Sequence, residues 1–144
     1  MNDAELLSYL RSHRYAVESS VSPNGAPQSA LVGIAISERL EIIFDALASN
    51  RKVANLKANP RVAFVVGGWV PGHERTIQYE GVIAFPFGEE LERIKHIYFQ
   101  AFPEGVKRQG WEGITYAVAK PLWVRVSDFN ANPPVVPERT YASP

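Results

Sequence analysis

The feature that most constrains this chain is a succession of short strand patterns joined by short links. Stretches that alternate in polarity, or are rich in β-branched and aromatic residues, predict six strands, at residues 14–21, 28–36, 41–45, 61–66, 76–85 and 114–127. Helical spacing of apolar residues occurs in three segments, at the N-terminus, after residue 50 and over residues 88–102. Sequential strands with short connections favour antiparallel pairing. We therefore predict a mainly β protein, a six-stranded antiparallel split barrel with about three peripheral helices.

The chain has the length of one domain. Its 144 residues can bury a real core, and they contain no internal repeat. From Asn130 onward the sequence becomes proline-rich, NPPVVPERTYASP. We expect residues 1–129 to form the domain and residues 130–144 to form an extended, poorly anchored tail.

Composition excludes several classes of function. The net charge is zero, which argues against nucleic-acid binding. No cysteine is present, so thiol catalysis, disulfides and Cys-ligated metals are excluded, and any redox chemistry requires a bound cofactor. No run approaches the ~18 apolar residues of a membrane helix, and the N-terminus lacks a signal-peptide pattern. We expect no membrane partner and a cytoplasmic location.

The titratable residues do not suggest a metal or hydrolytic site. His13, His73 and His96 are scattered without metal-ligand spacing, so we predict no metal. Glu74 and Glu80 lie at even spacing beside other polar residues, which is typical of a solvated strand face rather than of a paired-carboxylate hydrolase. No side chain is an evident general acid or base, and the catalytic residues stay unknown.

The helix predicted after residue 50 has an unusual start. Ser49 or Asn50 can cap it, and Arg51 and Lys52 then occupy its first turn. The helix dipole is positive there and disfavours each cation by roughly 0.3–1 kcal/mol. A bound phosphate, accepting hydrogen bonds from both side chains and from the free N–H groups, would explain the pair. Alternatively, both cations are solvated and their stems cover apolar neighbours.

Three segments, taken in order, resemble the pyridoxamine 5′-phosphate oxidase-like family, the FMN-binding split barrels. They are VSPNGAPQSALVG, FDALASNRKVANLKANPRVAFVV and ERTIQYEGVIA, the last following a tryptophan-containing loop. The similarity covers roughly residues 14 to 128. It implies a homodimer with one FMN in each of two clefts at the subunit interface.

The resemblance also implies positions for the cofactor. Arg51 and Lys52 match the cationic pair that binds the FMN phosphate, and Thr76 matches a polar residue near the flavin ring. The strand that runs along the ribityl chain and the ring edge is matched by four residues, Ser29, Ala30, Leu31 and Val32. Asp45 and Ala46 match the pair at the end of the next strand.

Two of these positions depart from the family pattern. Family members often carry a threonine where this chain has Ala46, and Ser49 or Asn50 can supply the missing polar group. Asp45 is an acid near a proposed phosphate, so we expect its side chain to point elsewhere, unless the local register differs.

Trp123 and Arg125 lie on the polar side of the last predicted strand, where a tryptophan is costly to leave in water. One interpretation places both against the flavin of the partner subunit. In the other, Trp123 packs under the helix at residues 88–102 and Arg125 forms a surface ion pair.

The resemblance implies a flavoprotein, and we expect an oxidoreductase that acts on an unidentified small molecule. True pyridoxamine phosphate oxidases end in an Arg-x-His segment that holds the substrate, whereas this tail contains no histidine. We therefore expect no such oxidase activity. The alternatives are a reductase that uses the deazaflavin F420, and a flavin or haem carrier or sensor without turnover.

Overall fold

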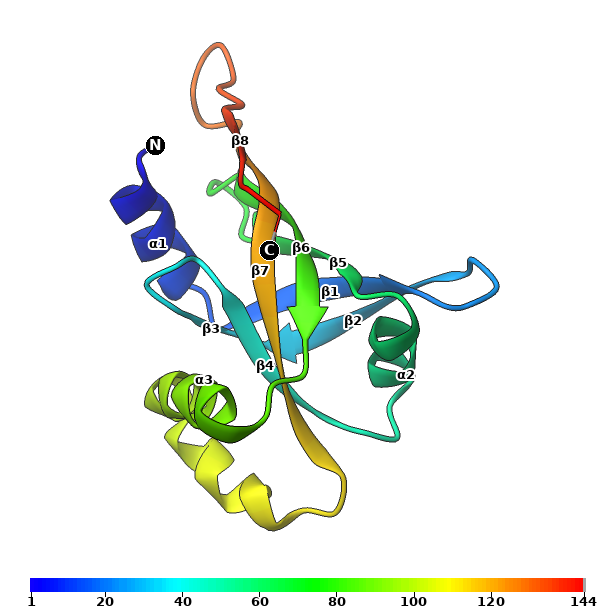
Figure 1. Ribbon diagram of the computed structural model, residues 1–144. Coiled ribbons are helices and arrows are strands. Elements are labelled where there is room, and N and C mark those ends of the chain that lie inside the picture. Colours follow the sequence, from blue (N-terminus) through cyan, green and yellow to red (C-terminus); the bar gives the residue numbers. More distant parts are fainter. Residues whose placement is uncertain (144) are drawn as a thin grey trace.

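The computed structural model describes residues 1–143. Its elements, in chain order, are α1 (Asp3–Arg11), β1 (Tyr15–Val21), β2 (Pro27–Gly33), β3 (Ala35–Ile36), β4 (Ile42–Leu47), α2 (Arg51–Ala58), β5 (Arg61–Gly67), β6 (Arg75–Ala84), α3 (Gly88–Ala101), the 3-10 helix η1 (Pro103–Gly110), β7 (Ile114–Asp128) and β8 (Glu138–Thr140). The prediction of a mainly β protein with a few peripheral helices is confirmed (Figure 1). Two short strands, β3 and β8, join the six that were predicted.

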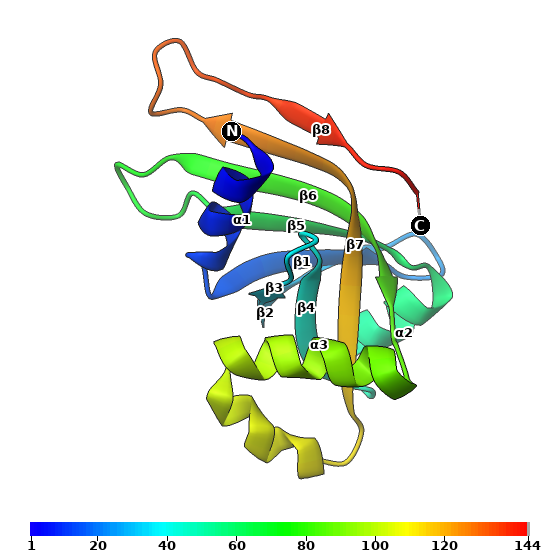
Figure 2. The same ribbon diagram turned by 60° about the vertical axis from the view of Figure 1, so that its left-hand side comes forward.

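All strands belong to one curled antiparallel sheet. The strand order is β2-β1-β5-β6-β7-β4-β3, and β8 pairs with β7 outside this path. β7 is long enough to pair with β4 through its first part and with β6 through the remainder. Figure 2 shows how this strand bends across the molecule and connects the two parts of the half-barrel.

Local signals explain the ends of two elements. Asn2 caps α1, because its side chain accepts from the Glu5 backbone at 2.8 Å while the Glu5 carboxylate accepts from the Asn2 backbone at 2.8 Å. The β1–β2 hairpin turns at Asn24-Gly25, as the sequence indicates, and Gly25 has a φ of 85°, which glycine adopts without strain.

Two apolar clusters lie on opposite faces of β4. Ile42, Phe44 and Ala46 face the main core inside the curled sheet. Ile43 faces a second cluster beneath α3, which includes Tyr98. Because successive strand side chains point to opposite faces, β4 separates the barrel interior from the layer formed by α3.

Two expectations about local structure are wrong. The segment at residues 28–36, predicted as one strand, is split between β2 and β3, and Leu31 within it is 66% exposed. The tail is anchored rather than loose, because β8 pairs with β7 and the Arg139 side chain contacts Asp3 and the backbone carbonyl of Met1. The proposed domain boundary after residue 129 stays a prediction.

None of the helices formed by residues 1–143 is long and apolar enough to cross a membrane.

Candidate cofactor site

The amino-terminal end of α2 has unsatisfied donors. Asn50 is the N-cap, but its side chain makes no capping hydrogen bond, and the first turn contains no acidic residue. The first backbone N–H groups that find an acceptor are those of Val53 and Ala54, which bond to the Asn50 carbonyl at 3.1 and 3.3 Å. Within residues 1–143, the N–H groups of Arg51 and Lys52 have no acceptor. This end of the helix therefore has both the dipole and the donors that an anion requires.

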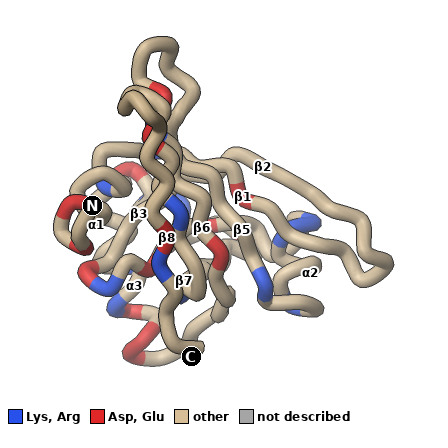
Figure 3. Tube along the Cα trace, turned by 90° about the horizontal axis from the view of Figure 1, so that it is seen from above, with Lys and Arg blue, Asp and Glu red and all other residues tan. Residues whose placement is uncertain are grey.

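Arg51 and Lys52 are also free as side chains. Neither forms an ion pair or a hydrogen bond within the described part of the chain. Arg51 is exposed and Lys52 is half-buried. Figure 3 shows basic segments and no acidic segment on α2, beside β1 and β2. Two unpaired cations at a helix start give a local positive potential that favours a phosphate.

Strands β2 and β4 bring further predicted residues to the inner side of the sheet. Val32 and Ala46 are buried in the main core, and Ala30 shares the face of Val32. α2 follows β4 after a short turn and is attached to the β1–β2 hairpin, because the Asn55 amide donates to Gln28 at 3.0 Å and to Ser20 at 3.2 Å. The fold thus gathers Ala30, Val32, Ala46 and Asn50–Lys52 on one side of the molecule.

Asp45 points away from the cationic pair, as expected. It lies on the face of β4 opposite to Ala46 and accepts from Arg108 of η1, with 2.9 Å between Arg108 Nε and the carboxylate. Arg108 also donates to the Tyr98 hydroxyl at 3.1 Å. Burial and the neighbouring Asp45 both raise the pKa of Tyr98. The carboxylate is therefore neutralised locally, and any contact of Asp45 with a cofactor at α2 must come from its backbone.

The remaining predicted residues lie on the outer face of the sheet. One row of cross-strand neighbours runs from Leu31 through β1, β5 and β6 to Arg125, and the next runs from Ser29 to Trp123. Thr76 lies further along the same face of β6. Within one chain these five residues do not join the residues around α2.

Trp123 and Arg125 are both bonded to the tail. Arg125 forms an ion pair with Glu138 at 3.0 Å, and the Trp123 indole donates to the same carboxylate at 3.3 Å. Trp123 is not part of the cluster beneath α3, so the interpretation that packs it there is wrong. The ion-pair interpretation of Arg125 agrees with the structure of one chain, while contact of either residue with a partner's flavin stays a prediction.

Two buried polar residues where α2 packs on β1 were not identified from the sequence. Glu18 is 1% exposed and Asn55 is 2% exposed. The sequence did contain a signal for Glu18, because the alternation in YAVESSV places it on the same face as the buried Ala16.

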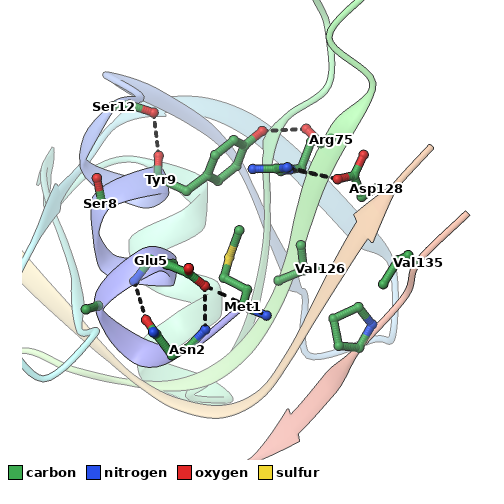
Figure 4. A pocket seen from close by; sticks show the side chains of 12 residues that line it. Met1, Asn2, Glu5, Ser8, Tyr9, Ser12, Arg75, Val126, Asp128 and Val135 are labelled. Carbon is green, nitrogen blue, oxygen red and sulfur yellow. Dashed lines mark hydrogen bonds and ion pairs between the residues drawn. The ribbon is translucent and has the colours of Figure 1, made fainter. Parts of the chain in front are cut away.

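A large cavity lies elsewhere. It has a volume of about 740 Å³ and is bordered by α1, by the end of β7 and by the tail. Figure 4 shows Tyr9 donating to the Arg75 backbone and the Arg75 side chain reaching Asp128 at 2.8 Å. A neighbouring cavity of about 440 Å³ brings His13, His73 and Trp69 together. Among residues 1–143, no three side chains are arranged to hold a metal ion.

Comparison with protein families gives one match. The family described as pyridoxamine 5′-phosphate oxidase matches residues 3–113. No curated protein sequence matches this chain.

Several solved structures share the fold. A haem-binding protein from Mycobacterium smegmatis aligns with a TM-score of 0.82 and 14% identity, covering 97% of this chain and 58% of that protein, so this chain spans little more than half of it. An FMN-binding protein related to pyridoxamine 5′-phosphate oxidase, from Nostoc punctiforme, aligns with a TM-score of 0.71 and 13% identity, covering 96% and 94% of the two chains. The haem storage protein of Vibrio cholerae has a TM-score of 0.71 and 12% identity, with 82% and 88% covered.

Proposed function

This chain belongs to the pyridoxamine 5′-phosphate oxidase family, and we propose that it binds FMN and acts as a flavin-dependent oxidoreductase on a small molecule. Flavins supply hydride transfer, and the protein supplies anchorage, orientation and electrostatics. In this proposal the FMN phosphate binds at the amino-terminal end of α2, and β2 and the end of β4 line the ribityl chain and the flavin ring.

The observation that carries the proposal is the unpaired state of Arg51 and Lys52. Seven other arginines, elsewhere in the chain, are bonded to carboxylates: Arg11, Arg14, Arg75, Arg93, Arg108, Arg125 and Arg139. The two cations at the start of α2 lack such partners within residues 1–143, and they stand beside two free N–H groups. A phosphate monoester would satisfy all four groups with charge-assisted hydrogen bonds.

The second part of the proposal is a homodimer that completes the site. Leu31, Val17 and Val65 are direct neighbours across β2, β1 and β5 on the outer face. Leu31 is 66% exposed and Val65 is 41% exposed, although both lie in the middle of strands. An apolar strip of this kind favours association. A second copy on this face would cover it, and Trp123 and Arg125 of the partner would then be available to the flavin.

The proposed substrate is not pyridoxamine 5′-phosphate. Holding that dianionic phosphate requires cations beyond those assigned to FMN. Arg139 is engaged with α1, Arg108 with Asp45 and Arg125 with Glu138. Lys107, on η1, is exposed.

Cofactor binding tests the proposal directly. The purified apo protein is titrated separately with FMN, riboflavin, F420 and haemin, and binding is followed by flavin fluorescence and absorption. We expect FMN to bind at least about a hundredfold more tightly than riboflavin, because only FMN carries the phosphate. Preference for F420 or haemin over FMN would replace the flavin with one of the alternatives and would contradict the proposal.

A further inference from the structure

A buried carboxylate lies beneath the proposed phosphate site. Glu18 of β1 is 1% exposed, and its Oε1 atom has no hydrogen-bond partner within the described chain. Buried charges are normally paired, because an unpaired one loses its hydration without compensation. Glu18 therefore requires a physical explanation.

Three elements pack around Glu18, and one of them supplies a charge. β2 presents Ala30 opposite Glu18, and β5 presents Phe64. α2 presents Lys52, whose positive charge acts on Glu18 although the two groups form no ion pair. The other polar groups nearby, those of Ser20, Gln28 and Asn55, do not titrate.

The geometry of α2 explains why Lys52 faces the strand. Lys52 and Asn55 are three residues apart and so lie on one face of the helix. Asn55 contacts Ser20, which lies two residues beyond Glu18 on the same face of β1. Lys52 therefore stands between two places for a negative charge, the Glu18 carboxylate below it and the anion site at the start of the helix.

We propose that Glu18 is a positioning residue that couples phosphate binding to proton uptake. When ionised, its carboxylate holds Lys52 toward β1. When a phosphate dianion binds at the start of α2, Lys52 turns to the dianion, and the carboxylate, now buried beside a like charge, takes up one proton from solvent. The proposal rests on the proposed function, because it concerns the same phosphate site.

The protonation required is accessible near neutral pH. Burial raises the pKa of Glu18 to about 6, and the Lys52 charge and the Ser20 hydroxyl act in the opposite direction. A bound dianion removes part of the Lys52 effect and adds repulsion, so it raises the pKa of Glu18 further. At high pH, each unit by which bound FMN raises the pKa of Glu18 makes the FMN affinity of wild type about tenfold lower than that of a variant with a neutral residue at position 18.

The first test compares the wild-type chain with Glu18→Gln. FMN affinity is measured by calorimetry from about pH 5 to about pH 8, with Glu89→Gln as the matched control, because Glu89 is an exposed carboxylate on α3. We expect Glu18→Gln to bind FMN about tenfold more tightly than wild type at the upper pH and equally at the lower pH. Titration of the FMN phosphate affects both proteins equally, so it cancels in the ratio of their FMN affinities. Glu89→Gln should match wild type throughout.

The second test uses the wild-type protein alone, so it does not depend on the folding of a variant. FMN binding enthalpies are measured near pH 7 in two buffers of different ionisation enthalpy, which gives the number of protons taken up. We expect a net uptake of about 0.3 proton for FMN, because Glu18 gains about 0.4 proton for a one-unit rise in its pKa while the FMN phosphate loses about 0.1 proton on binding as the dianion. Riboflavin, which lacks the phosphate, should take up none.

The outcomes separate the two proposals. If wild type binds FMN no better than riboflavin, the phosphate site itself is refuted. If FMN binds preferentially but the affinity ratio between wild type and Glu18→Gln does not change with pH, or no proton is taken up, the role of Glu18 alone is refuted.

Discussion

Replacing both Arg51 and Lys52 with alanine should remove most of the phosphate affinity. Hydrogen bonds to charged groups contribute roughly 1.5–3 kcal/mol each, so the loss of two amounts to about 3–6 kcal/mol, or about 10²–10⁴ in the dissociation constant of FMN. The hundredfold loss applies if the free N–H groups of α2 and a bound water still hold the phosphate in part. Titration of flavin fluorescence measures the change.

The same double variant should not destabilise the apo protein. Neither side chain forms an ion pair or a hydrogen bond within residues 1–143, and both stand at the positive end of the α2 dipole. Removing a cation from that position is favourable by roughly 0.3–1 kcal/mol. We therefore expect the melting temperature of the apo variant to equal or exceed that of wild type near pH 5, where Glu18 is mostly protonated and does not need the Lys52 charge.

A matched control removes the same charge at and just beyond the carboxyl-terminal end of α2. Lys57 lies in the last turn of α2 and Arg61 begins β5, and both are exposed. Their double alanine variant should bind FMN like wild type. The reasoning fails if the Arg51 and Lys52 variant keeps wild-type FMN affinity, or if it loses riboflavin affinity to the same extent.

The remaining predictions concern assembly, substrate, a buried ion pair and pH. Sedimentation at micromolar concentration should show a dimer, and Leu31→Lys should give a monomer; a dimeric variant would place the interface elsewhere. FMN-loaded protein incubated with pyridoxamine 5′-phosphate in air should form the aldehyde about a thousandfold more slowly than a true oxidase, and comparable turnover would refute this. Arg93→Ala should destabilise the protein by about 3 kcal/mol in denaturant unfolding, because it removes the partner at 3.0 Å from Glu41, which is 2% exposed; Lys95→Ala on the same helix should have little effect. Burial raises the pKa of Glu18 in the folded protein to about 6, so the free energy of unfolding falls as pH rises from about 4.5 to about 6. Glu18→Gln should therefore raise the melting temperature of the apo protein at neutral pH and not near pH 4. An equal effect at both pH values would contradict the assigned burial.

Much of the fold follows from local sequence patterns. The capped start of α1, the turn at Asn24-Gly25 and the cationic start of α2 each depend on residues within about four positions of one another. Such interactions are determined by backbone geometry alone, so the sequence predicts them directly. The residues at α2 that we propose for cofactor binding belong to this group.

The tertiary structure decided how side chains are paired over long distances. Asp45 is neutralised by Arg108, which lies 63 positions later, and no local pattern specifies that partner. The tail is held because β8 finds the free edge of β7, although its composition resembles a loose segment. Leu31 of β2 is 66% exposed, because no element formed by residues 1–143 covers that face, and the strand pattern alone does not reveal this.

Glu18 is the clearest example of a residue whose environment the sequence does not predict. The alternation of side chains along β1 places Glu18 on the inner face of this strand. The environment of Glu18 is set by the packing of α2, which brings Lys52 and Asn55 over the strand. Residues 18 and 52 are far apart in the chain, and their approach depends on the register of β1 with β2 and β5 and on the docking of the helix. The chain by itself determined that a cationic helix start exists, and only the packed structure placed a buried acid beneath it.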